Sequence, residues 1–231
     1  MALIEEYFDL VAACNTLEAQ PTGLGRAWRV QKWEMASLLG NGFRGGVFES
    51  DSEIIVGFSG TGGGSAAGSQ WTADIRIGAQ IIPNMAGGAQ DMVGWAKDLA
   101  RGRKPVSIAG HSLGGALAQV VGNWSGCPFI AFNGPGMKSH LKISAFNIFK
   151  PMQMVRSALA KNTDDTIGIC FSVKGDPVAT YGYHVGHEIV LNANVEGARN
   201  KHIMTPGMYL GLSAGGYLKQ TPRDILSIWP K

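Results

Sequence analysis

Residues 106–118 read VSIAGHSLGGALA, an apolar run that ends at a Gly-His-Ser-Leu-Gly-Gly sequence and passes at once into an Ala/Leu-rich segment. This is the layout of a nucleophile elbow, in which a serine stands on a sharp turn between a strand and a helix with its hydroxyl exposed. Gly110 and Gly114 flank Ser112 where a larger side chain would collide with the neighbouring backbone. A G-x-S-x-G pattern alone also occurs in ordinary turns. Together with the strand before it and the helix after it, the pattern predicts Ser112 as a nucleophile.

Length and composition indicate what class of protein carries this serine. The chain has 231 residues, of which 45% are hydrophobic and 16% charged, so we expect a single domain over residues 1–231 with a large buried core. The net charge of +3 is too small to indicate nucleic-acid binding. No apolar run has the length of a membrane span, and the first ten residues lack the basic start of a signal peptide. The expected location is the cytoplasm, or outside the cell after export by a route that needs no signal peptide.

The three cysteines, Cys14, Cys127 and Cys170, are odd in number and share no metal-binding spacing. At least one of them must be a free thiol. A disulfide framework is therefore not expected.

Hydrophobic periodicity predicts strands that alternate with helices along most of the chain. Strands are expected in the regions 28–30, 47–49, 53–59, 106–110, 128–132 and 166–173. Helices are expected over 3–18, 88–101, 113–124 and 150–161, with a Gly/Ser-rich loop at 60–69. This alternation predicts an α/β fold with a mostly parallel central sheet and helices on both faces, and the elbow places it among the α/β-hydrolases.

A serine nucleophile needs a histidine that takes its proton and a carboxylate that fixes the tautomer of that histidine. Functional residues of α/β sheets lie just beyond the carboxyl ends of the strands. Asp176 meets this condition because it directly follows the strand predicted at 166–173. Asp164 and Asp165 compete with it, but they precede that strand and would lie at its opposite end. An Asp before Pro is also a common turn residue, so position alone leaves the choice open.

Three histidines follow Asp176, in agreement with the Ser, Asp, His order of this fold. His184 and His187 lie before a strand, whereas His202 follows a polar loop and precedes a predicted C-terminal helix. The late position favours His202 as the base, with His184 and His187 as alternatives. His111 adjoins the serine in sequence, so its side chain is expected to point away from it. His140 precedes Asp176 and is in the wrong order.

An oxyanion hole needs two donors. The first is the backbone N–H of the residue after the nucleophile, here Leu113, at the positive end of the helix dipole. The second is expected from the loop after an earlier strand. Thr61 follows the strand predicted at 53–59 and is the candidate, although a Gly-Thr pair in a loop has no such role by itself.

With these residues in place, the chain resembles the class 3, fungal-type lipases of the α/β-hydrolases over about residues 54–205. The segments that carry the resemblance are 58–61 (FSGT), 71–74 (WTAD), 110–118 (GHSLGGALA), 132–136 (FNGPG), 174–178 (KGDPV), 183–188 (YHVGHE) and 202–204 (HIM). The resemblance implies Ser112, Asp176 and His202 as the catalytic triad and Thr61 as an oxyanion residue. In the family, the histidine of the strand that residues 183–188 resemble is usually not the base.

The chain departs from the secreted fungal members in several ways. Residues 83–88 (PNMAGG) stand where the family has His-x-Gly-Phe, and the disulfides have no counterpart. The Gly/Ser-rich loop cannot form the amphipathic helix of a lid, so activation at a lipid interface is not expected. Residues 148–159 and 204–212 are the alternative segments that could cover the site. These features are more similar to a bacterial branch of the family without signal peptides.

The sequence therefore predicts a serine ester hydrolase, a lipase or esterase, that cleaves acyl esters of acylglycerols or related lipids. Its expected partners are a lipid or small ester substrate and a transiently contacted membrane surface. No metal or organic cofactor is implied. The alternatives are a phospholipase A1-type antibacterial effector and an inactive hydrolase fold that serves as a binding module.

Overall fold

A computed structural model describes residues 1–15, 24, 27–34, 44–60, 71–144, 155 and 162–230, with only the backbone for 71–84 and 142–144. Its seven strands form one sheet in which they follow each other in chain order. The strands are β1 (Arg29–Glu34), β2 (Gly45–Glu49), β3 (Ile54–Phe58), β4 (Val106–His111), β5 (Phe129–Phe132), β6 (Gly168–Val173) and β7 (His187–Leu191). β1, β2 and β3 pair antiparallel, whereas β3 to β7 are all parallel. The carboxyl ends of the five parallel strands therefore meet at one edge of the sheet.

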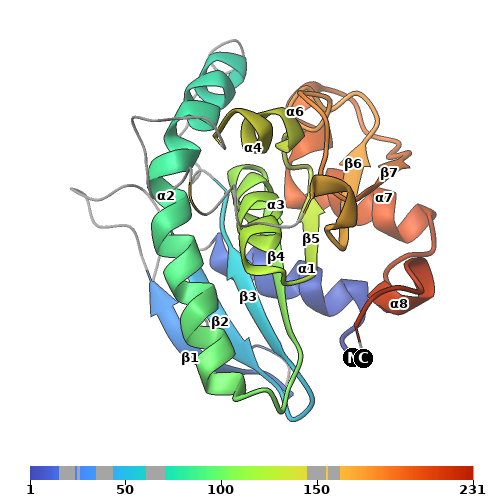
Figure 1. Cartoon of the computed structure of the whole chain (residues 1–231). Coiled ribbons are helices and arrows are strands. Elements are labelled where there is room, and N and C mark those ends of the chain that lie inside the picture. Colours follow the sequence, from blue (N-terminus) through green and yellow to red (C-terminus); the bar gives the residue numbers. More distant parts are fainter. Residues whose placement is uncertain are drawn as a thin grey trace.

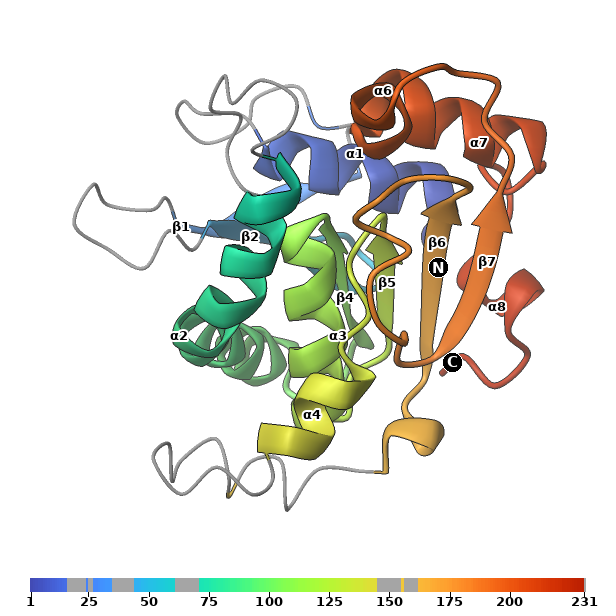
Figure 2. The same cartoon turned by 90° about the horizontal axis from the view of Figure 1, so that it is seen from above.

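Helices cover both faces of this sheet. α2 (Trp71–Ala100), α3 (Leu113–Ser125) and α4 (Lys138–Ser144) lie on one face, and α1 (Ile4–Cys14) and α7 (Tyr209–Ala214) lie on the other (Figures 1 and 2). The remaining helical segments are η2 (Thr163–Asp165), α6 (Ala198–His202), η3 (Met204–Met208) and α8 (Pro222–Ile225). None of the helices within the described ranges is long and apolar enough to cross a membrane.

Two hydrophobic cores follow from the alternation of side chains along the strands. Ile54 and Val56 pack with α2 and α3, while Ile55 between them packs with α1 on the opposite face. Parallel strands covered on both faces bury every side chain, which explains their continuous apolar runs. The three cysteines are all buried and free, as the absence of a disulfide framework requires.

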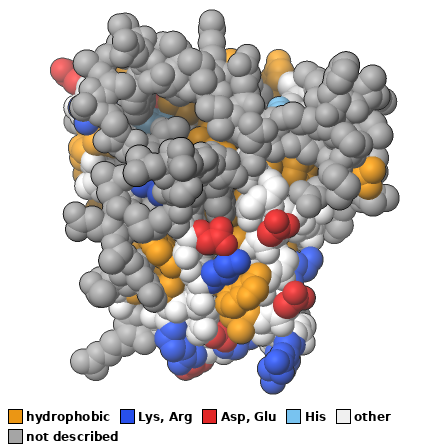
Figure 3. All heavy atoms as spheres, turned by 90° about the vertical axis from the view of Figure 1, so that its left-hand side faces the viewer, with side chains coloured by type: hydrophobic (Ala, Val, Ile, Leu, Met, Phe, Trp, Pro, Cys, Tyr) orange, Lys and Arg blue, Asp and Glu red, His pale blue; other side chains and the backbone are white. Residues whose placement is uncertain are grey.

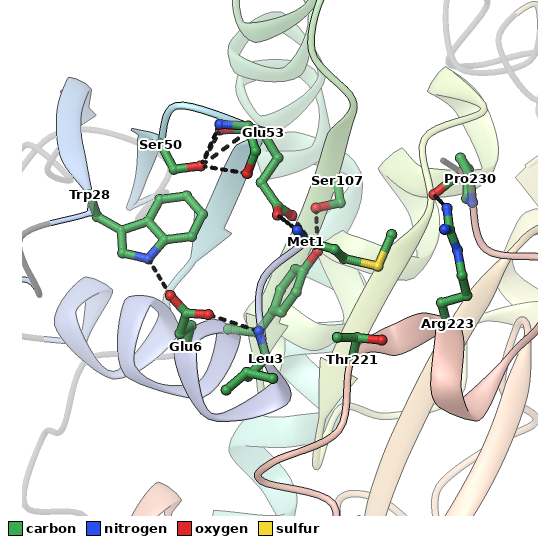
Figure 4. A network of polar contacts seen from close by, with 12 residues as sticks. Met1, Leu3, Glu6, Trp28, Ser50, Glu53, Ser107, Thr221, Arg223 and Pro230 are labelled. Atoms are coloured by element: carbon green, nitrogen blue, oxygen red, sulfur yellow. Dashed lines mark hydrogen bonds and ion pairs between the residues drawn. The ribbon is translucent and has the colours of Figure 1, made fainter.

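Polar contacts fix α1 to the edge of the sheet opposite the strands' carboxyl ends. The Tyr7 hydroxyl lies 2.9 Å from Ser107 Oγ and 3.4 Å from a carboxylate oxygen of Glu53. The other Glu53 oxygen lies 3.2 Å from the amino group of Met1 (Figure 4). Burial raises the pKa of Tyr7, and the nearby Glu53 carboxylate raises it further, so this hydroxyl keeps its proton.

The structure corrects two predicted helix boundaries. α1 ends at Cys14, before the predicted end at residue 18. α2 begins at Trp71, 17 residues before the predicted start at residue 88. The prediction stopped there because Pro and Gly are poor helix formers, but Met85, Ala86 and Ala89 are fully or almost fully buried, and this packing outweighs local propensity. The helix expected at 150–161 and the loop expected at 60–69 lie outside the described residues, apart from Gly60 and the helical backbone of Val155.

The elbow between β4 and α3 is built on glycines in close contact. A Cβ atom on Gly110 would lie 2.1 Å from the carbonyl oxygen of Gly114, and one on Gly114 would lie 2.3 Å from the carbonyl oxygen of Phe58. Both obstacles are backbone atoms of packed elements, so no side-chain movement can relieve them. The predicted collision of any larger residue at Gly110 and Gly114 is confirmed.

We expect the Gly110→Ala substitution to lower the free energy of unfolding by about 3 kcal/mol or more, because the elbow backbone must move to admit the methyl group. Gly94→Ala is the matched control. Gly94 lies within α2 with no atom within 4 Å of its would-be Cβ, so alanine there should be neutral or raise stability by up to about 1 kcal/mol. Thermal melting of both variants measures the difference. Equal melting temperatures would contradict this account of the elbow.

Candidate active site

Ser112 lies at the carboxyl end of β4, directly before the first residue of α3. Its backbone has φ 55° and ψ −121°, a conformation that costs free energy for any residue except glycine. Two hydrogen bonds hold it in place: its N–H donates to the carbonyl of Phe132 at 3.0 Å, and its own carbonyl accepts from Ala116 N–H at 3.1 Å. The hydroxyl is thereby fixed above the edge where the parallel strands end.

His202 contacts this serine, and Asp176 contacts His202. His202 Nε2 lies 2.8 Å from Ser112 Oγ, and His202 Nδ1 lies 2.9 Å from a carboxylate oxygen of Asp176. A carboxylate can only accept, so Nδ1 carries the proton and donates it to Asp176. Nε2 is then the acceptor and faces the serine hydroxyl. The structure thus brings together the three side chains that the sequence analysis singled out.

Asp176 is completely buried at the turn that follows β6. Its second carboxylate oxygen accepts the backbone N–H of Val178 at 3.0 Å, which fixes the orientation of the carboxylate. The competing Asp164 and Asp165 lie in η2, before β6, at the opposite end of that strand. Asp164 forms an ion pair with Lys138 there.

The alternative histidines lie elsewhere. His187 begins β7 and is exposed, and the Nε2 atom of His184 lies 2.9 Å from the carbonyl of Ala179. His140 is in α4, on the face of the sheet covered by α2 and α3. The sequence analysis placed His202 after a polar loop. In the structure it is the last residue of α6, a helix of five residues that starts after Gly197. Gly197, with φ 80°, allows the sharp entry into this helix, a local effect that hydrophobic periodicity does not register.

His111 makes a hydrogen bond in the site that the sequence analysis did not predict. Its Nε2 lies 2.8 Å from the backbone carbonyl of His202, so this nitrogen carries a proton and donates it. The two imidazole rings are 5.0 Å apart. Burial, and then the neighbouring His202, lower the pKa of His111 to about 3. His111 therefore stays neutral and does not compete for the proton of Ser112.

Asn133 is the second residue that the sequence analysis missed. It directly follows β5, is completely buried and has φ 46°. Its Nδ2 donates to the carbonyls of Lys201 at 2.8 Å and His202 at 3.0 Å, and its Oδ1 accepts the N–H of Val173 at 2.8 Å. One side chain thus joins the end of β6 to the end of α6. The signal in the sequence was an Asn in a Gly-rich turn, since Asn tolerates a positive φ.

A third residue that the sequence analysis missed, Asn15, lies near the expected oxyanion hole. Asn15, at the end of α1, accepts the N–H of Gly60 through Oδ1 at 2.9 Å. Gly60 lies against the nucleophile, since a Cβ on it would be 3.1 Å from Ser112 Cβ. Leu113, as the first residue of α3, has no acceptor for its N–H within the helix. Thr61 lies outside the described residues. Across the described ranges, no group of three His, Cys, Asp or Glu side chains could hold a metal ion.

Comparison with protein families shows to which family a chain with this site belongs. The model of the Tle-like phospholipase domain, described as phospholipase-like, matches residues 18–212, which is most of the chain. The chain belongs to this family. The predicted resemblance to lipases and the predicted enzyme class, an ester hydrolase of the lipase type, are thereby confirmed. A search of curated proteins found no match to this Tle-like domain.

Solved structures show the same fold at low sequence identity. MDLA of Penicillium cyclopium, as a mutant form, superposes with a TM-score of 0.52 at 16% identity and covers 98% of this chain and 93% of its own. The Rhizomucor miehei lipase propeptide complex gives 0.52 at 16% identity, with 94% and 80% covered. Lip2 lipase of Yarrowia lipolytica gives 0.51 at 14%, with 83% and 78% covered. The α/β-hydrolase fold predicted from the sequence is confirmed.

His111 should make the stability of this Tle-like domain depend on pH. Below its ordinary pKa of 6.5 the unfolded chain protonates His111, whereas the folded chain does not until about pH 3. The free energy of unfolding of the wild type should therefore fall as the pH drops through this window. His111 contributes up to about 1.4 kcal/mol of this loss per pH unit. His111→Gln keeps a donor but does not titrate, so the stability difference between wild type and variant should shrink as the pH falls. Melting temperatures from pH 7 to pH 3.5 test this, and a constant difference would contradict it.

Proposed function

We propose that Ser112, His202 and Asp176 form the catalytic triad of an enzyme that hydrolyses acyl esters of glycerophospholipids. The observation that carries the proposal is the continuous line of two short hydrogen bonds from Ser112 Oγ through His202 to the buried Asp176. The strained serine at the head of a 13-residue helix supports it. A binding module without catalytic activity would not need a histidine whose tautomer is fixed by a buried carboxylate.

The geometry implies the steps of the reaction. Ser112 Oγ attacks the acyl carbonyl carbon while its proton passes to His202 Nε2, and Asp176 stabilises the imidazolium that forms. The oxyanion of the tetrahedral intermediate accepts the Leu113 N–H at the positive end of α3, and we assign Thr61 as the second donor. His202 then gives its proton to the departing alcohol oxygen. Water, deprotonated by the same nitrogen, releases the fatty acid and restores the serine.

The family description favours a phospholipid over an uncharged acylglycerol as the substrate. Such substrates reside in membranes, so the enzyme is expected to contact a membrane surface transiently while an acyl chain enters the site. The products of one turnover would be a fatty acid and a lysophospholipid. The same chemistry fits the phospholipase A1 alternative if the ester cleaved is that of the first glycerol carbon.

Two histidine substitutions separate the proposed base from its alternatives. His202→Ala should lower kcat by about 10⁴-fold or more, because a triad acts as a unit. His187→Ala, at the exposed start of β7, is the matched control and should keep wild-type rates. Fatty-acid release from a short-chain phospholipid measures both, and circular dichroism verifies folding. A folded His202→Ala protein with wild-type activity would transfer the role of the base to another group.

A further inference from the structure

The side chain of Lys201 extends across the turn that carries Asp176. A Cβ on Gly175 would lie 3.0 Å from Lys201 Nζ and within 4 Å of its last two methylene carbons, so only glycine leaves room for this lysine. Gly175 also has φ 79°, a conformation that favours glycine. Lys201 precedes His202, and Gly175 precedes Asp176. The ammonium group therefore lies beside the residue that precedes Asp176.

Lys201 forms no ion pair with a carboxylate in the described part of the structure. Lys32, Lys104, Lys138 and Lys219 each pair with a carboxylate, but no ion pair there includes Lys201, the exposed Lys174 or the exposed Arg199. Within 192–203 the sequence has one acidic residue, Glu196. By contrast, the described part of the face in Figure 3 shows Lys and Arg intermixed with Asp and Glu. Lys174, Arg199 and Lys201 thus bring three cationic side chains to the two chain segments that carry Asp176 and His202.

The backbone that carries Lys201 is rigid. Its carbonyl accepts Asn133 Nδ2 at 2.8 Å, and its N–H donates to the carbonyl of Gly197 at 3.2 Å. These bonds fix the point from which the lysine side chain extends. Its position is also coupled to that of His202, because the same Asn133 amide holds both carbonyls.

We propose that Lys201, assisted by the positive charge of Lys174, binds the phosphate of the glycerophospholipid substrate. The inference rests on the proposed function and adds the group that distinguishes a phospholipid from an acylglycerol. In a glycerophospholipid the phosphodiester and the acyl esters are attached to the same three-carbon unit. When an acyl carbonyl reaches Ser112, the phosphate therefore lies at the rim of the site. A lysine ammonium is a compact point charge suited to a phosphate oxygen.

The test compares two dissolved substrates with the same acyl chains, dihexanoylphosphatidylglycerol and dihexanoylglycerol, both below the concentrations at which they aggregate. The measured quantity is the ratio of their kcat/KM values. Lys201→Gln should lower this ratio about fivefold, through the KM of the phospholipid, and Lys174→Gln should lower it by a smaller factor. Lys201→Arg should restore most of it. Added salt should lower the wild-type ratio more than that of Lys201→Gln.

Lys97→Gln is the matched control, because Lys97 lies on α2 and donates to the carbonyl of Ser125, away from the proposed triad. It removes the same charge and should leave the ratio unchanged. An unchanged ratio in folded Lys201→Gln, or an equal loss on both substrates, would overturn the subsite. An effect on phosphatidylglycerol vesicles but not on the dissolved lipid would overturn it too, since Lys201 would then sense the membrane surface. If the wild type cleaves neither substrate, the proposed function itself fails.

Discussion

The side-chain amide of Asn133 joins the strand that ends at Val173 to the helix that ends at His202, and the geometry of the site depends on this connection. Its acceptor oxygen fixes the end of β6, three residues before Asp176, while its donor nitrogen holds the carbonyls of Lys201 and His202. His111 supplies a further donor to the His202 carbonyl. Asn133, His111 and His202 are buried, and leaving one of their polar groups without its partner would cost about 1–3 kcal/mol. The distance between His202 and Asp176 is therefore set by a network and not by the two residues alone.

The remaining geometry follows from the parallel arrangement of the sheet. β4, β5 and β6 end at the same edge and deliver Ser112, Asn133 and the turn of Asp176 to it in that order. The opposite edge has a different role, since the contacts of Tyr7 with Ser107 and Glu53 there anchor α1. α1 in turn places Asn15 against Gly60, beside the nucleophile. Anchoring at one edge of the sheet thus supports the chemistry at the other.

Local signals in the sequence predicted the elbow, the parallel strands and the position of Asp176, because each depends on residues close together in the chain. The start of α2 at Trp71 was missed, since Pro83, Gly87 and Gly88 disfavour a helix locally while packing against α3 favours it. The roles of Asn133 and Asn15 could not be predicted either. Asn133 reaches His202 across 69 positions, and Asn15 reaches Gly60 across 45, so no short motif contains either pair. An amide in a turn becomes informative only when its partners are known.

The central claim is that Ser112 is a nucleophile activated by His202, and covalent capture tests it most directly. The intact protein would be treated with a fluorophosphonate probe, digested and analysed by mass spectrometry. The account predicts one phosphonylated residue, Ser112, with labelling abolished in Ser112→Ala and slowed by orders of magnitude in folded His202→Ala. A wild-type protein that remains unlabelled at Ser112, or a folded His202→Ala protein that labels as fast as wild type, would contradict it.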